Sequence, residues 1–188
     1  MRRPLRIGVL ALQGAFREHV RALTKLGAEA VEVRLPEEVG SLDGLVIPGG
    51  ESTTIMQLAS SYGLDEAIRS FRGALFGTCA GMIVLDRAHL AVADVEVDRN
   101  AYGRQVRSFE ADVDLRDDDL PLHGVFIRAP RVRELGPAVE VLGERDGDPV
   151  LLREGRVLLA SFHPELTDDL RVHELFLQMV REEQHVGA

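Results

Sequence analysis

The sequence has 188 residues, of which 45% are hydrophobic and 28% are charged, with one cysteine and a net charge of −9. These values are typical of a globular protein, so we expect a single domain over residues 1–188. The single cysteine excludes an intrachain disulfide, and the negative net charge argues against binding to nucleic acid. No apolar run approaches the roughly 20 residues that cross a bilayer. We therefore predict no membrane association and a cytoplasmic location.

The first half predicts alternating strands and helices, because short apolar runs alternate with segments of helical periodicity. The predicted strands are 7–12, 31–35, 42–47 and the run that ends at Gly77, and the predicted helices are one that follows Gly14 and two more over about 52–60 and 65–72. This order is typical of an open α/β sheet with parallel strands. We therefore expect an open, mostly parallel central sheet flanked by helices.

The second half predicts mainly strands and turns. Strand-like pieces cover 95–97, 109–115, 125–127 and 139–142, and a buried strand covers 157–162. Asp146-Gly147 is a hairpin signal, so antiparallel strands are expected in this half. The three aspartates at 117–119 are interpreted as a solvated turn. Thr167 is expected to cap a last helix, with Asp168 and Asp169 in its first turn.

The only cysteine, Cys79, lies between a predicted strand and a predicted helix. The pattern Gly77-x-Cys79-x-Gly81 has the spacing of a nucleophile elbow, in which side chains at the flanking positions would collide. The start of a helix favours the thiolate, which is the reactive form of cysteine. A lone cysteine is also commonly a small buried hydrophobic residue, so the elbow alone leaves both interpretations open.

A second candidate site is His163-Pro164-Glu165, at the end of the last predicted strand. Pro164 favours an extended conformation for His163, and side chains two apart in an extended segment share a face. A histidine close to a carboxylate is what a cysteine nucleophile needs as its general base. The alternative is a surface histidine beside a solvated glutamate. The other histidines (His19, His89, His123, His173 and His185) are expected in surface helices or polar connections and are assigned no chemistry.

The turn Pro48-Gly49-Gly50-Glu51 follows a strand and precedes a helix. Its two glycines leave N–H groups that could form an oxyanion hole, although a plain tight turn or a phosphate cradle would use glycine too. Arg104 and Arg128 lie in or beside predicted loops. Either could bind a substrate carboxylate through paired hydrogen bonds, although most loop arginines have no such role.

Together these stretches resemble the class I, triad-type glutamine amidotransferases, whose fold is flavodoxin-like. The shared motifs are the Gly-Thr-Cys-Ala-Gly elbow, the Gly-Gly-Glu-Ser-Thr-Thr turn and the Ser-Phe-His-Pro-Glu-Leu-Thr segment. The stretches 10–19, 100–105 and 126–130 narrow the resemblance to glutaminase subunits of pyridoxal 5′-phosphate synthases. The resemblance covers about residues 7–180. One departure is visible, since the segment 86–95 is shorter than this family leads us to expect.

The resemblance implies a role for each motif residue. Cys79 is the implied nucleophile, His163 the base and then the acid, and Glu165 the group that orients His163. Gly50 and Ala80 are the implied oxyanion donors. The implied contacts to L-glutamine come from Gly49, Gly50, Glu51, Arg104, Ile127 and Arg128. No cofactor and no metal are implied.

The implied reaction is hydrolysis of L-glutamine to glutamate and ammonia through a cysteine thioester. The ammonia would pass to a separate (β/α)8-barrel synthase subunit that builds pyridoxal 5′-phosphate (vitamin B6) from ribose 5-phosphate and glyceraldehyde 3-phosphate. Two alternatives stay open at this point. One is a class I glutaminase that serves another synthase, such as imidazole glycerol phosphate synthase, and the other is a non-enzymatic α/β binding module.

Overall fold

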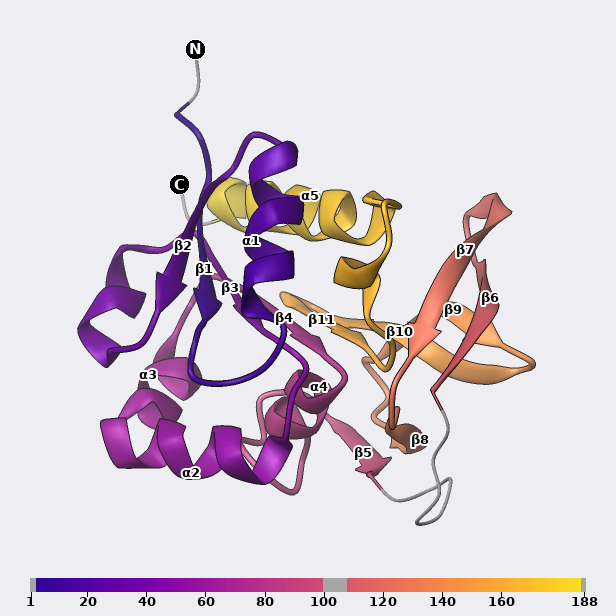
Figure 1. Cartoon of the computed structure of the whole chain (residues 1–188), viewed down its shortest axis with the longest axis horizontal. Coiled ribbons are helices and arrows are strands. Elements are labelled where there is room, and N and C mark those ends of the chain that lie inside the picture. The colour runs from indigo at the N-terminus through magenta and orange to yellow at the C-terminus, as the bar shows by residue number, and fades with distance from the viewer. Residues whose placement is uncertain (1–2, 100–107, 187–188) are drawn as a thin grey trace.

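A large sheet runs through the molecule, with helices on both of its faces (Figure 1). The computed structural model describes residues 3–99 and 108–186. Its strands are β1 (Arg6–Leu10), β2 (Glu29–Val33), β3 (Gly44–Ile47), β4 (Ala74–Thr78), β5 (Val95–Asp98), β6 (Phe109–Leu115), β7 (Asp118–Phe126), β8 (Arg131–Leu135), β9 (Glu140–Arg145), β10 (Asp148–Glu154) and β11 (Val157–Ala160). Its α-helices are α1 (Phe16–Lys25), α2 (Ser52–Tyr62), α3 (Leu64–Ser70), α4 (Ala80–Leu85) and α5 (Arg171–Val186).

The nine strands of the large sheet follow the order β2-β1-β3-β4-β11-β10-β9-β6-β7. The first five of these are parallel, and the strands from β10 onward are antiparallel to their neighbours. The predicted mixed α/β sheet, with its antiparallel second half, is therefore confirmed. Strand β11 lies at the boundary, where Ala160 pairs with Thr78 of β4 on one side and Leu151 of β10 on the other.

Two hydrophobic cores lie on opposite faces of the sheet. The helices α1 and α5 pack on one face through residues such as Leu23 and Phe176. The helices α2, α3 and α4 cover the other face, where Ile55, Ile68 and Met82 are buried. Because the central strands are covered on both faces, β3, β4 and β11 are buried along their whole length. Their continuous apolar runs in the sequence have this cause.

In the second half, the structure corrects one prediction and adds one strand. The turn between β6 and β7 consists of Arg116 and Asp117, and β7 already begins at Asp118, whose carboxylate pairs with Arg171. The aspartates at 117–119 are thus not merely a solvated turn. In addition, the sequence does not predict β8, because its polar residues pair only with the short strand β5.

Thr167 does not cap the last helix. A 3-10 helix, Pro164–Leu166, ends at Thr167, and α5 begins only at Arg171. The Thr167 hydroxyl accepts a hydrogen bond from the Asp169 N–H at 3.3 Å, and the Asp169 carboxylate accepts one from the Arg171 N–H at 3.1 Å. Pro164 begins the short 3-10 helix that precedes α5, so the helix starts further along the chain than predicted. The Asp169 carboxylate therefore accepts the hydrogen bond from the first N–H of α5 in place of Thr167.

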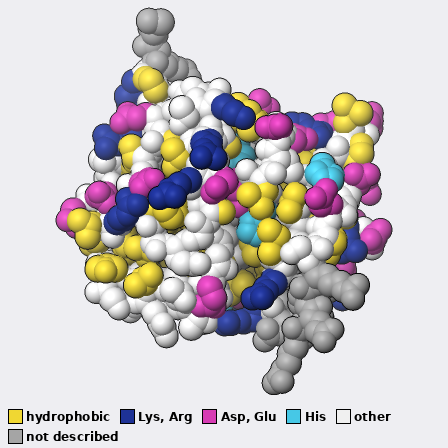
Figure 2. All heavy atoms as spheres, viewed as in Figure 1, with side chains coloured by type: hydrophobic (Ala, Val, Ile, Leu, Met, Phe, Trp, Pro, Cys, Tyr) yellow, Lys and Arg dark blue, Asp and Glu magenta, His cyan; other side chains and the backbone are white. Residues whose placement is uncertain are grey.

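The surface charge is unevenly spread. Figure 2 shows Lys and Arg side chains gathered over α1, where Arg17, Arg21 and Lys25 are exposed at four-residue spacing, although the chain as a whole is acidic. Among the described residues, the helices are too short or too polar to span a membrane.

Candidate active site

Cys79 occupies a sharp corner between β4 and α4. Its backbone has φ 50° and ψ −107°, a strained conformation for a residue with a side chain. A Cβ atom on Gly77 would lie 2.7 Å from the carbonyl group of Gly81, and one on Gly81 would overlap the carbonyl oxygen of Ile47. The two glycines of the elbow are therefore required by close backbone packing, as the sequence predicted.

His163 is brought to Cys79 by the pairing of β11 with β4. The N–H of Cys79 donates to the carbonyl of Ala160 at 2.8 Å, and the N–H of His163 donates to the carbonyl of Val125 at 2.8 Å. His163 has φ −108° and ψ 85°, outside the helical region, as expected before Pro164. The structure thus places both side chains at the carboxyl ends of neighbouring parallel strands, where α/β sheets form their sites.

Cys79, His163 and Glu165 form one hydrogen-bonded array. Nδ1 of His163 lies 2.7 Å from Oε1 of Glu165, which leaves Nε2 for the hydrogen bond between the imidazole and the Cys79 side chain. All three residues are buried, with exposed fractions of 5 to 7%. The Cys79 sulfur also lies 3.5 Å from the carbonyl oxygen of Ile127.

The electrostatics of this array favour a charged imidazole. Burial alone would lower the pKa of His163, but its hydrogen bonds to Cys79 and Glu165 and their negative charges raise that pKa to about 10. Burial would raise the pKa of Glu165, but the neighbouring imidazoles of His19 and His163 keep it below its usual range. The site therefore stabilises an imidazolium next to a carboxylate.

The glycine turn after β3 lies directly against this array. A Cβ atom on Gly49 would overlap the His163 ring and lie 3.3 Å from Cβ of Cys79. The Gly49 carbonyl accepts a hydrogen bond from the Ala15 N–H at 3.1 Å, and a side chain on Gly14 would overlap that same carbonyl. The turn after β1 therefore packs against the Gly49–Gly50 peptide and binds its carbonyl oxygen in this structure.

The next turn residues connect to α2. The side-chain oxygen of Gln13 accepts a hydrogen bond from the Glu51 N–H at 2.7 Å. The Glu51 carboxylate caps α2 by accepting from the N–H groups of Thr53 and Thr54 and from the Thr54 hydroxyl. These hydrogen bonds lower the pKa of Glu51 to about 2. Its carboxylate is therefore ionised at neutral pH and is half exposed.

A cavity of about 660 Å³ opens in front of Cys79. Its lining includes Cys79, His163, Ala80 and four of the predicted glutamine contacts, which are Gly50, Glu51, Ile127 and Arg128; the remaining lining residues are Gln13, Ser52, Ile83, Arg99 and Ser108. Gly49 packs behind this lining, and Arg104 lies outside the described residues. Between described residues, the N–H groups of Gly50 and Ala80 donate no hydrogen bond.

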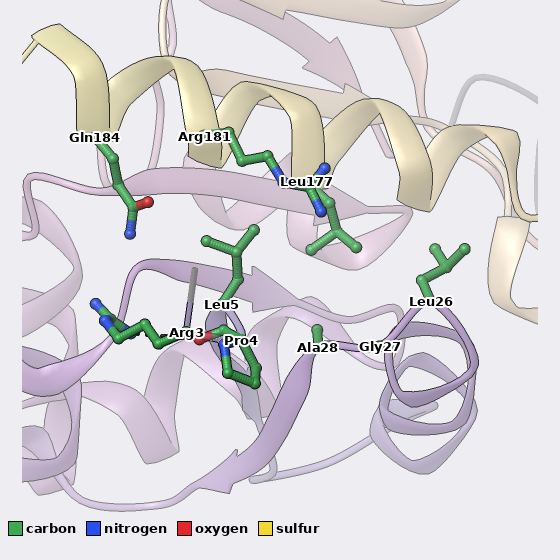
Figure 3. A pocket seen from close by; sticks show the side chains of 9 residues that line it. All are labelled: Arg3, Pro4, Leu5, Leu26, Gly27, Ala28, Leu177, Arg181 and Gln184. Atoms are coloured by element: carbon green, nitrogen blue, oxygen red, sulfur yellow. Dashed lines mark hydrogen bonds between the residues drawn. The ribbon is translucent and has the colours of Figure 1, made fainter. Parts of the chain in front are cut away.

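A second cavity, of about 440 Å³, lies at the opposite end of the sheet (Figure 3). It is formed by the chain before β1, the α1–β2 turn and the last part of α5, and therefore lies beside the amino ends of the parallel strands. Arg3 at its rim is paired with Asp43. Within the described residues, no group of three or more His, Cys, Asp and Glu side chains is placed to hold a metal ion.

Comparison with known proteins identifies the family. Residues 9–182 match the model of the SNO glutamine amidotransferase family. The chain belongs to this family. It is similar to pyridoxal 5′-phosphate synthase subunit PdxT of Niallia circulans, with 50% identity over 95% of this chain and 99% of the relative. PdxT of Thermus thermophilus is 54% identical over 92% of this chain and 96% of the relative.

Solved structures agree with the membership of the SNO family. A crystal structure of a glutamine amidotransferase, 50% identical, matches with a TM-score of 0.86 over 93% of this chain and 98% of its own. A glutamine amidotransferase from Thermotoga maritima matches with a TM-score of 0.60 over 97% of this chain and 93% of its own, at 14% identity. The second likeness concerns the fold alone. The family and fold predicted from the motifs are thus confirmed.

Sequence reasoning missed Arg99. The side chain of this residue lines the cavity, donates to the Thr53 hydroxyl at 3.1 Å and lies 3.8 Å from the Glu51 carboxylate. It directly precedes the stretch 100–105, so its place in the sequence is a usable signal. The motif resemblance points to Arg104 of that stretch instead, and Arg104 lies outside the described residues.

Three other histidines also differ from the prediction. His19 and His173 have no exposed surface, although their helical spacing suggests surface positions. They hydrogen-bond to each other behind Glu165, with His19 Nδ1 2.9 Å from His173 Nε2. The buried face of each helix is wider than its apolar stripe, so polar residues beside the stripe are buried too. His123 lies in β7 and not in a connection.

Proposed function

We propose that the chain is the glutaminase subunit of a pyridoxal 5′-phosphate synthase. It hydrolyses L-glutamine to L-glutamate and ammonia and delivers the ammonia to a (β/α)8-barrel synthase subunit in the cytoplasm. The observation that carries this proposal is the buried Cys79–His163–Glu165 array, in which Cys79 and His163 line a cavity that Arg99 and Arg128 also line. The high identity to PdxT proteins, which are named as subunits of that synthase, supports the choice of partner.

The first half of the reaction forms a thioester. His163 holds the proton of the Cys79 thiol as an imidazolium, and the Cys79 sulfur attacks the side-chain amide carbon of glutamine. The resulting oxyanion is stabilised by the N–H groups of Gly50 and Ala80. The C–N bond then breaks, and the imidazolium gives its proton to the leaving ammonia. Glu165 holds the ring through Nδ1 and stabilises its positive charge throughout.

The second half of the reaction returns the enzyme to its starting state. His163, now neutral, takes a proton from water, and the hydroxide attacks the thioester carbon. The C–S bond breaks, glutamate leaves, and the Cys79 sulfur is again paired with the protonated His163. The glutamine α-carboxylate is bound meanwhile by Arg99 or Arg128, whose guanidinium groups line the same cavity.

The proposal is tested by measuring glutamate and ammonia release with and without the synthase subunit. Cys79→Ala should keep the fold and lose all but a few per cent of turnover, because the chain has no second cysteine. His163→Gln should be similarly severe, and Glu165→Gln should lose less, because it orients the base and is not the base itself. A glutamine-analogue electrophile should label wild-type Cys79. An unlabelled Cys79 without turnover would identify a non-enzymatic binding module instead.

A further inference from the structure

A buried polar cluster lies behind Glu165, and the reaction above does not use it. It consists of His19 on α1, His173 on α5 and Thr78 at the end of β4, all with no exposed surface. Nε2 of His19 lies 3.1 Å from the Thr78 hydroxyl oxygen and 3.4 Å from Oε2 of Glu165. Nδ1 of His19 lies 2.9 Å from Nε2 of His173. His19 therefore touches both the triad carboxylate and the second histidine.

The partners of these rings decide where their protons lie. Nδ1 of His173 and Oε2 of Glu165 are both buried with no hydrogen-bond partner. The nitrogen Nε2 of His19 lies 3.4 Å from Oε2 of Glu165. If His19 donated through Nδ1, the bare Nε2 lone pair would face the carboxylate, and His173 would bury an unpaired N–H. If His173 donates from Nε2 to His19, no N–H is left unpaired, because His19 Nε2–H then donates to the Thr78 hydroxyl and lies 3.4 Å from Oε2 of Glu165. The second arrangement avoids both costs.

The surroundings keep both rings neutral. Burial lowers the pKa of His173 to about 3, and a proton on His19 would lower it further. Burial also lowers the pKa of His19. The charge of His163 lowers it further, and the negative charges of Glu165 and Glu18 only partly oppose this shift. Neutral imidazoles can donate to Glu165 without cancelling its charge. The carboxylate thus keeps its negative charge for His163.

We propose that His19 is a positioning residue of the active site, whose Nε2–H is hydrogen-bonded to Thr78 and stabilises the nearby second carboxylate oxygen of Glu165 at 3.4 Å, while His173 fixes the tautomer of His19. This inference rests on the proposed function, because it assigns His19 to the same reaction. The two oxygens of Glu165 then have separate partners. Oε1 faces His163, and Oε2 faces His19. Rotation of the carboxylate away from His163 would break the second contact.

The test compares two substitutions of His19 in the full chain with its synthase subunit. His19→Phe removes the donor and keeps the ring volume. We expect it to lower kcat about tenfold with little change in KM, since the buried carboxylate oxygen loses the N–H that lies 3.4 Å from it and glutamine does not touch His19. The acid limb of the pH profile should move to higher pH, because Glu165 then protonates more easily. His19→Gln, whose amide can replace Nε2–H, should restore most of both properties.

Two further variants separate positioning from packing. Phe76→Leu disturbs the ring that packs edge-on against His19 and His173, at 5.9 Å from each, without removing a hydrogen bond. It should lower Tm and leave the pH profile in place. In a Glu165→Gln background, His19→Phe should cause no further loss of kcat, because its effect acts through Glu165.

Several outcomes would overturn the inference. One is a folded His19→Phe protein with the kcat and the pH profile of wild type. Another is a loss of kcat on adding His19→Phe to Glu165→Gln that is as large as the loss in the wild-type background. If His19→Phe does not fold, His173→Leu should show the same shift of the pH profile on a smaller scale. An unshifted pH profile in His173→Leu would then contradict the proposal. If wild type lacks glutaminase activity, the proposed function fails by itself. The pH dependence of Cys79 alkylation by iodoacetamide then still tests whether His19 acts on the array.

Discussion

Arg171, at the start of α5, holds Asp118, at the start of β7, through an ion pair of 2.8 Å. The same guanidinium donates to the carbonyls of Leu120 and Pro121 at 2.8 and 3.0 Å. One side chain therefore ties the β6–β7 hairpin, which extends beyond the rest of the molecule (Figure 1), to the last helix. The hairpin carries Val125, whose carbonyl anchors His163, so this contact also supports the candidate site.

Arg171→Leu should lower the free energy of unfolding by about 1 kcal/mol. The ion pair is about a third exposed and contributes little by itself, but two carbonyls lose a charged donor. Urea denaturation measures the change. Arg116→Leu, in the exposed turn of the same hairpin, is the matched control and should change stability by less than about 0.5 kcal/mol. Equal effects would contradict the anchoring role.

Gly49→Ala should abolish most glutaminase activity, because the new methyl group would overlap the His163 ring. We expect kcat to fall at least 100-fold, since the ring or the oxyanion turn must move. The control is Gly40→Ala, where a Cβ atom meets no other atom within 4 Å, and which should keep normal kcat. Steady-state kinetics on both variants decide the matter, and a nearly normal kcat in Gly49→Ala would disprove the contact.

His173 should make the protein sensitive to acid. The pKa of this histidine is about 3 in the folded protein and about 6.5 when unfolded, so the unfolded chain binds the extra proton below pH 6.5. Its contribution to stability is thus complete above pH 6.5 and falls by up to about 1.4 kcal/mol per pH unit as the pH decreases toward 3. His173→Leu should flatten the stability curve between pH 6.5 and 4.5, as measured by urea denaturation. A curve parallel to the wild-type curve would contradict this account.

Arg99→Lys or Arg128→Lys should raise the KM for glutamine about tenfold at whichever position binds the α-carboxylate, with little change in Tm. Lysine keeps the charge but cannot form the paired hydrogen bonds. Arg133→Lys, on β8 and paired with Asp98, is a control outside the cavity. An unchanged KM in both cavity variants would remove these arginines from glutamine binding.

The synthase subunit should raise kcat more than it lowers KM. The Gly49 carbonyl is hydrogen-bonded to the Ala15 N–H. In the planar trans peptide, the Gly50 N–H therefore points away from Ala15. We expect a docked partner to turn this peptide toward the oxyanion, which matters in the transition state and not in ground-state binding. Steady-state kinetics with and without a saturating concentration of the synthase subunit measure the changes in kcat and KM. Full activity of the isolated chain would show that the donor is already in place.

The sequence predicted the parts of the site that depend on local backbone rules. The corner at Cys79 and the non-helical conformation of His163 follow from glycine and proline sterics, and the succession of strands and helices in the first half follows from apolar runs. It could not reveal contacts between distant elements. The burial of His19 depends on α5 packing beside α1, and the role of Asp118 depends on Arg171, 53 residues away. Charged and polar residues look alike in a sequence whether they are solvated or paired.

The pairing of β4 with β11 has a consequence for folding order. Cys79 ends one of these strands, and His163 follows the other, with the antiparallel strands lying between them in the sequence. Contacts between residues so far apart close a long loop, and they form late because the loop entropy must be overcome first. A chain that is still leaving the ribosome therefore carries its cysteine without the histidine that activates it. Reactivity toward glutamine begins only when β11 has entered the sheet.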